Sequence, residues 1–367
     1  MTFVVNCGSF DTSSNVAHAR RPRPTASDRR RCRRIAMVAA LYLLAGCSWG
    51  RGGPKADNVP RIVWPEPPEQ ARIELVSVFS GASELGIERS IWTRLANLIT
   101  GGADVQMVRP TGIAVSSERI AVADPGAGVV HVYDLSRHRA VVLAACRAVA
   151  LGEPVGVAML ADRIYVSDSA RARIDVFDSA GDCEASWELE SGSRPAGVAA
   201  DSSRARLYVA DVGAHRVLGF DPQGNVILRI GNRGIDAGEF NYPTWVAVDD
   251  AGNLYVTDSL NFRVQIFDPN GTPTGAFGDQ GDSSGQLARP KGIGVDRDGH
   301  LYLVDALFDA VQLFGRDGRY LMVFGGQGRE PGHFWLPSGL AVDHDRIFVA
   351  DSYNRRVQVF RFLGGGS

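Results

Sequence analysis

The sequence predicts an all-β fold, a six-bladed β-propeller, on three observations. Glycine and proline are frequent, with 42 and 18 among 367 residues, which is typical of short strands joined by tight turns. One sequence unit recurs six times, and each copy carries alternating apolar segments long enough for about four strands. A further strand-like segment precedes the first copy and can complete the last one. Four strands in repeats of roughly 40 to 50 residues are typical of propeller blades.

The six copies share three blocks, which in the first copy read RPTGIAV, RIAVAD and VVHVYD within residues 109–134. Successive copies are 44, 41, 48, 47 and 47 residues apart, measured between the prolines of the first block: Pro110, Pro154, Pro195, Pro243, Pro290 and Pro337. A fourth strand follows turn sequences such as Asp-Pro-Gln-Gly at 221–224. The last copy lacks that strand, and residues 72–79 can supply it and close the ring, which leaves no open sheet edge. We therefore expect the propeller at 72–362 and a short tail at 363–367.

The N-terminal region predicts export and attachment to a membrane. Arginines at 29–34 precede an apolar run from Ile35 to Ala45, which is too short to span a bilayer and is typical of a signal peptide. The run ends in Leu44-Ala45-Gly46-Cys47, which resembles the bacterial lipobox, so Cys47 is the expected lipidation site. We assign 1–47 to an upstream extension and a lipoprotein signal peptide. Residues 48–71, rich in proline and glycine, are expected to be a tether.

Charge limits the class of partner. The first 47 residues hold eight Arg and two Asp, which leaves 31 basic and 39 acidic residues and a charge of −8 for the rest. That balance argues against nucleic acid as a partner.

Between the N-terminal strand and the first copy, residues at about 88–100 show helical spacing and predict one amphipathic helical insert.

The blocks P-x-G-[IVL]-[AG]-[VMA], [LI]-[YFA]-[VL]-x-D and R-V-x-[VI]-F-D resemble the NHL repeat family over about residues 72 to 362. The resemblance implies the six-bladed fold. It implies little about function, because propellers host both unrelated chemistries and pure binding roles.

Two sets of charged residues recur within the copies. One Asp ends the second strand of every copy, and an Arg follows it five residues later in four of them, a spacing that predicts structural pairing within a blade. These residues are Asp124, Asp168, Asp211, Asp258, Asp305, Asp351, Arg173, Arg216, Arg263 and Arg356.

A second set lies where the chain enters the innermost strands, at the mouth of the central channel. Arg109, Arg194 and Arg289 occupy this position in copies one, three and five, with Lys291 close by. Three guanidinium groups around such an axis suit a carboxylate or a phosphate, or a haem propionate. Alternatively, each Arg pairs with an acidic residue of a neighbouring blade or faces solvent. Trp245 replaces the glycine of the other five copies, where it could stack on a ligand or fill space.

Propellers related to the NHL family include metal-dependent lyases with His-ligated zinc and lactonases with Glu, Asn and Asp around a divalent ion. The six histidines beyond residue 47 occupy six different repeat positions and do not converge as a zinc site requires. We therefore predict no metal, no cofactor and no catalytic residue, although an enzyme of the lyase or lactonase type remains the alternative. Cys146 and Cys183 are expected near opposite faces of the disc, so no disulfide is predicted.

The sequence hypothesis is a lipid-anchored scaffold or binding module of the bacterial cell envelope, on the periplasmic side of the outer membrane. Its partner is expected to be an envelope protein or a peptide, with a polysaccharide also open. The membrane is contacted only through the lipid, and the protein is expected to be a monomer.

Overall fold

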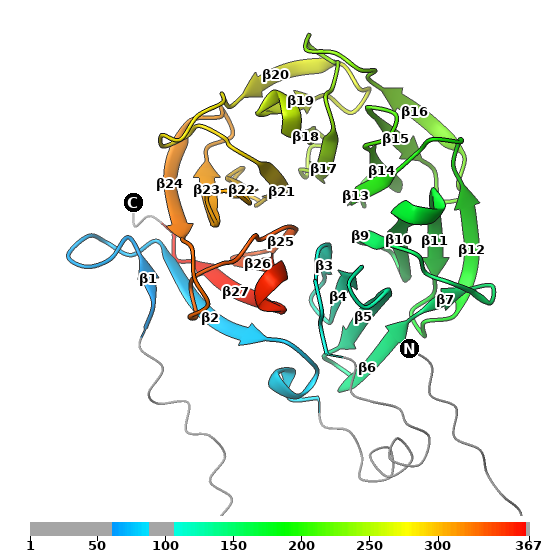
Figure 1. Ribbon diagram of the computed structural model, residues 1–367, viewed down its shortest axis with the longest axis horizontal. Coiled ribbons are helices and arrows are strands. Elements are labelled where there is room, and N and C mark those ends of the chain that lie inside the picture. Colours follow the sequence, from blue (N-terminus) through cyan, green and yellow to red (C-terminus); the bar gives the residue numbers. More distant parts are fainter. Residues whose placement is uncertain (1–60, 88–105, 365–367) are drawn as a thin grey trace, which may run out of the picture. The chain divides into compact units, whose positions relative to one another are not determined.

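The computed structural model describes residues 61–87 and 106–364, and Pro60–Ser367 form one compact unit. Cys47, the signal peptide and the helical insert expected at about 88–100 lie outside the described residues. Five four-stranded sheets and one five-stranded sheet surround a central channel and form a closed six-bladed β-propeller (Figure 1). The fold class and the number of blades predicted from the repeats are confirmed.

Each of the first five blades is an antiparallel sheet whose strands follow in sequence from the channel to the rim. Blades one and two are β3(Ile113–Val115), β4(Arg119–Asp124), β5(Val129–Asp134), β6(Arg139–Leu143) and β9(Pro154–Leu160), β10(Arg163–Asp168), β11(Arg173–Phe177), β12(Cys183–Glu188). Blades three and four are β13(Pro195–Asp201), β14(Arg206–Asp211), β15(Arg216–Phe220), β16(Val226–Ile230) and β17(Pro243–Val248), β18(Leu254–Asp258), β19(Arg263–Phe267), β20(Pro273–Phe277). Blade five is β21(Pro290–Val295), β22(Leu301–Asp305), β23(Ala310–Phe314), β24(Tyr320–Gly325).

Blade six joins the two ends of the described chain. Its inner strands are β25(Leu340–Asp343), β26(Arg346–Asp351) and β27(Arg356–Phe362), and its outer strand is β2(Ile73–Phe79). β2 pairs antiparallel with β27, with Leu75 opposite Phe360. The N-terminal segment therefore closes the ring, as the sequence predicts, and the last blade has no unpaired outer edge at β27.

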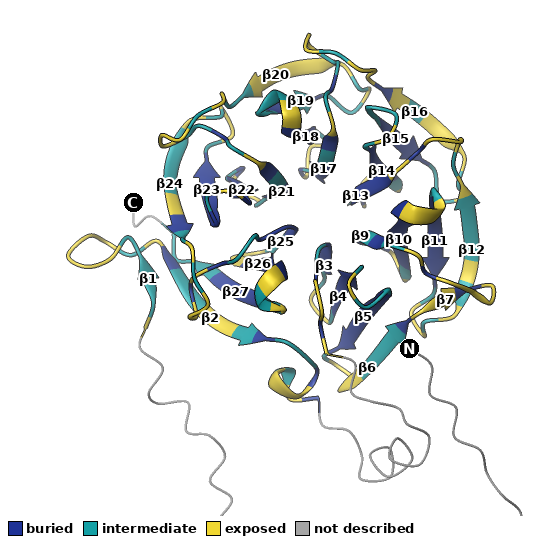
Figure 2. Cartoon of the chain, in the orientation of Figure 1, coloured by how far each residue is buried: buried dark blue, intermediate teal, exposed yellow. Residues whose placement is uncertain are grey.

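The hydrophobic core lies between neighbouring blades. One cluster, for example, joins Tyr165 and Val176 of blade two to Val209 and Phe220 of blade three. Burial is deepest in the middle strands, while the rim and the loops are more exposed (Figure 2). Short 3-10 turns follow the second strand in several blades: η2(Ser169–Arg171), η3(Ser259–Asn261) and η4(Ser352–Asn354), with η1(Ser83–Leu85) after β2.

The expected tether is too long at its C-terminal end. β1(Val63–Trp64) pairs with β2 and adds a fifth strand to blade six. The Trp64 ring lies 5.7 Å from Phe360 and 6.0 Å from Phe324, measured between ring centroids. Residues 61–71 therefore belong to the propeller, because Trp64 buries its ring on the blade core and the prolines around it flank the short strand.

The prediction of no disulfide is wrong. Cys146 and Cys183 form a disulfide, with Cα atoms 5.1 Å apart. The prediction assumed that outer strands stand upright, so that the end of one and the start of the next lie at opposite faces. Blade twist turns the outer strands along the rim (Figure 1). The hairpin of β7(Ala145–Cys146) and β8(Val149–Ala150), which follows β6, therefore reaches the beginning of β12.

Candidate functional site

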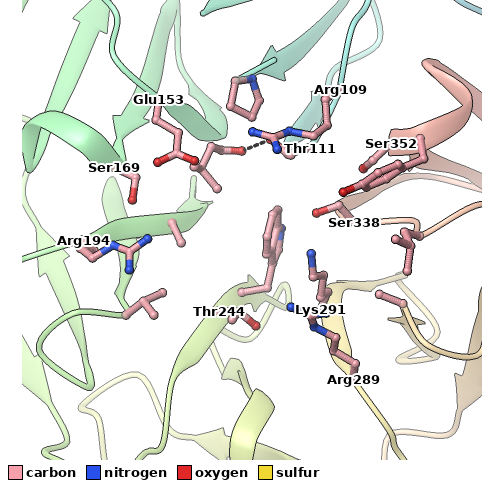
Figure 3. Close-up of a pocket in the computed structure, with 18 residues that line it drawn as sticks. Arg109, Thr111, Glu153, Ser169, Arg194, Thr244, Arg289, Lys291, Ser338 and Ser352 are labelled. Atoms are coloured by element: carbon pink, nitrogen blue, oxygen red, sulfur yellow. Dashed lines mark hydrogen bonds between the residues drawn. The ribbon is translucent and has the colours of Figure 1, made fainter.

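A cavity of about 320 Å³ occupies one mouth of the central channel and is lined by residues of all six blades. Its lining comes from the loops that enter the innermost strands, from the first residues of those strands, and from the loops that leave the second strands. Arg109, Arg194, Arg289 and Lys291 extend into it from different sides (Figure 3). Trp245 also lines the cavity, so the structure brings together the five residues that the sequence placed at the channel mouth.

The recurring Asp fixes the backbone of the loops that carry the mouth residues. Asp124 accepts hydrogen bonds from the backbone N–H groups of Val108 and Arg109, at 2.6 and 2.9 Å. Asp211 accepts one from the N–H of Arg194 at 2.8 Å, and Asp305 one from the N–H of Arg289 at 2.9 Å. Each mouth arginine is therefore held by the buried carboxylate of its own blade. Because this contact uses the backbone N–H, the guanidinium group of each mouth arginine is left for other contacts.

The arginines five residues after the recurring Asp form ion pairs within their own blades. Arg216, Arg263 and Arg356 place Nε 3.1, 2.9 and 2.7 Å from the carboxylates of Asp211, Asp258 and Asp351. Arg173 lies 3.9 Å from Asp168 and closer, at 3.0 Å, to Asp175.

Blade one lacks this arginine and uses a histidine instead. Val129 stands at the arginine position, and the buried His131 approaches Asp124 with Nε2 at 3.4 Å. Burial opposes a low pKa for Asp124, but hydrogen bonds from His131, Val108 and Arg109 outweigh it and hold that pKa below its usual value. His131 therefore helps to hold Asp124 within blade one and does not line the mouth cavity.

The mouth cations, by contrast, have no partners among the described residues. Within residues 61–87 and 106–364, the side chains of Arg109, Arg194, Arg289 and Lys291 make no hydrogen bond or ion pair. This geometry argues against the alternative in which each arginine pairs with a neighbouring blade. Burial, together with the charges of Arg289 and Arg109, lowers the pKa of Lys291 to about 8. The cavity therefore concentrates positive charge that the described part of the protein does not neutralise.

Trp245 closes part of the channel beneath these cations. It is only 7% exposed, and its ring spans the space left by glycines of two other blades. A Cβ atom at Gly197 would lie 2.9 Å from its Cγ, and one at Gly339 would lie 3.0 Å from its Cζ2. The geometry supports the space-filling role of Trp245, and stacking on a ligand stays a prediction.

Sequence reasoning missed the one carboxylate of the cavity, Glu153. The signal was available, because Glu153 precedes Pro154 as Arg109 precedes Pro110. Hydroxyl groups of the lining were missed too, and they tie neighbouring blades together. Thr111 donates to the carbonyl of Val155 at 2.8 Å, and Ser352 to the carbonyl of Pro110 at 2.6 Å.

Potential metal ligands occur away from this cavity. Asp296, Asp298 and His300 offer ligand atoms within 4.8 Å of one another, on a turn at the opposite end of the innermost strand β21. Asp296 already bonds His300 Nδ1 at 2.9 Å and the Tyr302 hydroxyl at 3.0 Å, so the cluster has a structural explanation. In the part of the chain that the structure describes, the mouth cavity itself is lined by one carboxylate and no histidine.

Comparison with known proteins identifies the repeat. The NHL repeat model matches residues 193–220, 240–267 and 334–360, which lie in blades three, four and six. The chain is a six-bladed β-propeller that contains NHL repeats. No curated protein matches its sequence significantly. Within the described ranges, no helix of this NHL propeller has both the length and the apolar character needed to cross a membrane.

Solved structures share the fold of this NHL propeller at low identity. Virginiamycin B lyase of Staphylococcus aureus has a TM-score of 0.53 and 14% identity, over 70% of this chain and 95% of that one. A gluconolactonase of Xanthomonas campestris has a TM-score of 0.53 and 17% identity, over 71% and 90%. A Bacteroides thetaiotaomicron protein of unknown function has a TM-score of 0.57 and 17% identity, over 79% and 75%. These likenesses extend to the fold alone.

Proposed function

We propose that this protein is a binding module of the bacterial cell envelope that holds an anionic group of its partner in the mouth of the propeller. The observation that carries this proposal is the set of cations around one cavity without partners among the described residues: Arg109, Arg194, Arg289 and Lys291. Other arginines of the propeller, in blades three, four and six, are paired with carboxylates at 2.7 to 3.1 Å. The mouth therefore differs from the rest of the molecule in its charge balance.

The physical argument is one of compensation. Bringing like charges together in a partly dehydrated cavity is unfavourable, and the lowered pKa of Lys291 expresses that cost. An incoming carboxylate or phosphate removes the repulsion and accepts paired hydrogen bonds from a guanidinium group. The three arginines come from blades one, three and five, so they surround the channel axis. They can hold one anionic group between them.

The envelope assignment depends on the sequence. The arginine-rich start, the apolar run from Ile35 to Ala45 and Leu44-Ala45-Gly46-Cys47 support lipid attachment at Cys47. Acylation would hold the propeller at a membrane surface. Replacing Cys47 by serine should move the protein from the membrane fraction to the soluble fraction. An unchanged distribution would contradict attachment at Cys47.

A metal-dependent lyase or lactonase is the alternative that the sequence left open. Such chemistry needs about three converging protein ligands and an open position on the metal. Among the described residues, Glu153 is the one carboxylate in the lining of the mouth cavity, and no histidine accompanies it. The binding module therefore accounts better for the residues present.

Calorimetry with simple anions tests the proposal. The full-length Cys47→Ser protein is titrated with inorganic phosphate and with succinate, and the Arg109→Ala/Arg194→Ala/Arg289→Ala variant is titrated beside it. The matched control is Arg139→Ala/Arg297→Ala/Arg319→Ala, three exposed arginines outside the cavity. We expect binding in the parent and the control, and its loss in the mouth variant. Absence of binding in the parent, or equal binding in all three proteins, would contradict the proposal.

A further inference from the structure

One loop position on the mouth side divides the propeller into two halves. It is the residue two places after the recurring Asp, in the loop that leaves the second strand. In blades one to three the residue is small, and in blades four to six it is large, apolar and about half exposed. The residues in blade order are Gly126, Ala170, Gly213, Leu260 at 49% exposure, Leu307 at 57% and Tyr353 at 48%.

The topology places these three large residues on the same face as the cationic cavity. Second strands end at the mouth, since Ala306 and Tyr353 in the loops after them line the cavity. Loops that enter the innermost strands lie on this face too, and one of them exposes Tyr242 at 42%. We call Tyr242, Leu260, Leu307 and Tyr353 the apolar arc.

The opposite face differs from the mouth face. Among the described residues, each large apolar side chain classed as exposed lies on an outer strand, on β8 of the hairpin that follows β6, or in a loop of the mouth side. The turns that join first to second and third to fourth strands, at the far face, contribute none of them. Isolated exposed apolar residues are ordinary, but the gathering of the exposed apolar loop residues on one face around a cavity indicates an interaction surface.

Two aromatic members of the arc are held in place by their neighbours. The Tyr353 ring lies 5.6 Å from the Trp335 ring, and the Arg329 guanidinium lies 4.9 Å from the centre of Trp335. Tyr242 has a φ of 60°, a left-handed conformation that is rare for a bulky side chain. Its N–H donates to His215 Nδ1 at 3.3 Å, and the two rings meet edge to face at 5.0 Å. Backbone strain of this kind tends to persist where a residue is functionally constrained.

The small residues of the other half make room for the arginines. A Cβ atom at Gly126 would lie 2.8 Å from Cβ of Arg109, and one at Gly213 would lie 3.0 Å from the backbone nitrogen of Arg194. The mouth face is therefore built with two arginines over small loops on one side and an apolar arc on the other. Arg289 and Lys291 lie in blade five, within the apolar half.

We propose that the mouth face binds an acidic segment of a partner protein, which inserts a carboxylate among the arginines and lays apolar side chains on the apolar arc. The inference rests on the proposed anion-binding function and adds the chemistry of the partner. The carboxylate is that of an Asp or Glu side chain or of a chain end. Charge complementarity selects an acidic segment, and the arc selects leucine, phenylalanine or tryptophan within a few residues of the acid.

An anionic membrane surface fits the same face less well. The cations line a cavity closed below by Trp245, where a protruding side chain reaches them more easily than the phosphates of a flat bilayer. The arc also covers only half of the face, which suits a single bound segment lying across the mouth.

Selection from a random peptide library tests the inference. Phage-displayed dodecapeptides are selected on the full-length Cys47→Ser protein, and enriched peptides are measured against three variants. The mouth variant is Arg109→Ala/Arg194→Ala/Arg289→Ala, the arc variant is Leu260→Ser/Leu307→Ser/Tyr353→Ser, and the control is Arg139→Ala/Arg297→Ala/Arg319→Ala. Circular dichroism and thermal melting establish that each variant is folded.

We expect enriched peptides to pair an acidic residue with nearby large apolar residues. Binding should fall about tenfold or more in the mouth and arc variants, and stay unchanged in the control. Replacing the acidic residue of the peptide by its amide should have the same effect as the mouth variant. Enrichment of peptides without an acid, or binding that is insensitive to the arc variant, would overturn the inference.

The failure of this inference is distinguishable from that of the proposed function. If phosphate and succinate bind through the mouth arginines but no acidic apolar peptide is enriched, the anion site stands and the partner chemistry is wrong. If neither binds, both are wrong. Vesicles containing phosphatidylglycerol provide the remaining arm. Vesicle binding that requires the arc would assign this surface to a membrane and overturn the inference.

Discussion

Replacing Lys291 by methionine should stabilise the folded protein while weakening its binding of anions. Lys291 lies in the mouth cavity beside Arg109 and Arg289 and forms no ion pair with a carboxylate of the described residues. Methionine keeps much of the length and apolar character of the side chain and removes the ammonium group. The variant therefore isolates the cost of that charge.

The magnitude follows from the pKa of Lys291. Its pKa falls from 10.5 to about 8 on folding, a difference equivalent to about 3 kcal/mol. At about pH 7 the amine is protonated in both the folded and the unfolded chain, so the whole cost falls on the folded state. Because the ammonium group retains some access to water, we expect Lys291→Met to raise the free energy of unfolding by about 1 to 3 kcal/mol.

The dependence of stability on pH tests the direction of the effect of Lys291 on folding. Between about pH 8 and pH 10.5 the unfolded chain binds more protons at this position than the folded chain, so the wild-type protein becomes more stable as pH rises. The advantage of Lys291→Met should therefore shrink over that window. Urea unfolding near pH 7 and near pH 10 measures it, with Lys291→Arg as the control that keeps the charge.

A direct titration is also available. The sequence contains two lysines, Lys55 and Lys291, so ¹³C-methylation gives few signals to follow by NMR. We expect the Lys291 signal, assigned by its absence from Lys291→Met, to titrate near pH 8. The reasoning is refuted if Lys291 titrates at the ordinary lysine value, or if Lys291→Met is less stable than wild type near pH 7.

Other predictions concern the blades. Asp258→Ala should lower the free energy of unfolding by about 3 kcal/mol or more, because the Asp258 carboxylate binds Arg263 at 2.9 Å and the N–H of Asn241 at 2.6 Å. The control in the same urea assay is Asp250→Ala, at an exposed position. Equal effects of the two substitutions would contradict the reasoning. Replacing both Cys146 and Cys183 by serine should cost about 2 to 4 kcal/mol, and intact non-reduced protein should be two hydrogens lighter than reduced protein by mass spectrometry; an unchanged mass would rule out the disulfide. Gly339→Ala should destabilise by about 1 to 3 kcal/mol, because its Cβ would meet the carbonyl of Thr111 and the Trp245 ring. Gly81→Ala, with only a side-chain atom at 3.7 Å, is the matched control, and a melting temperature as high as that of this control would contradict the close packing.

Much of the fold could be predicted because the same strand and turn pattern occurs six times in the sequence. The phase of the Asp and Pro markers predicts the blades, and the missing last strand predicts ring closure through β2. Asp211 and Arg216 could be paired from sequence, since Arg216 follows Asp211 by five residues across the short turn between two adjacent strands. Arg109, Arg194 and Arg289 could be placed around one mouth for the same reason, since repeat position determines position around the ring.

Contacts between blades were beyond the reach of such reasoning. The disulfide of Cys146 and Cys183 depends on blade twist, which carries outer strands along the rim. The packing of Trp64 on Phe360 depends on a strand of two residues that leaves almost no periodic signal.

The sequence by itself determined the propeller, the number of its blades, the way the ring closes and the identity of the charged residues at its mouth. Each of these depends on short-range spacing repeated in phase. Only the tertiary structure decided that the mouth cations lack partners within the described chain, that Trp245 fills the channel over Gly197 and Gly339, and that the apolar arc shares their face. These features depend on distances between side chains of different blades, which the twist and packing of the closed ring set.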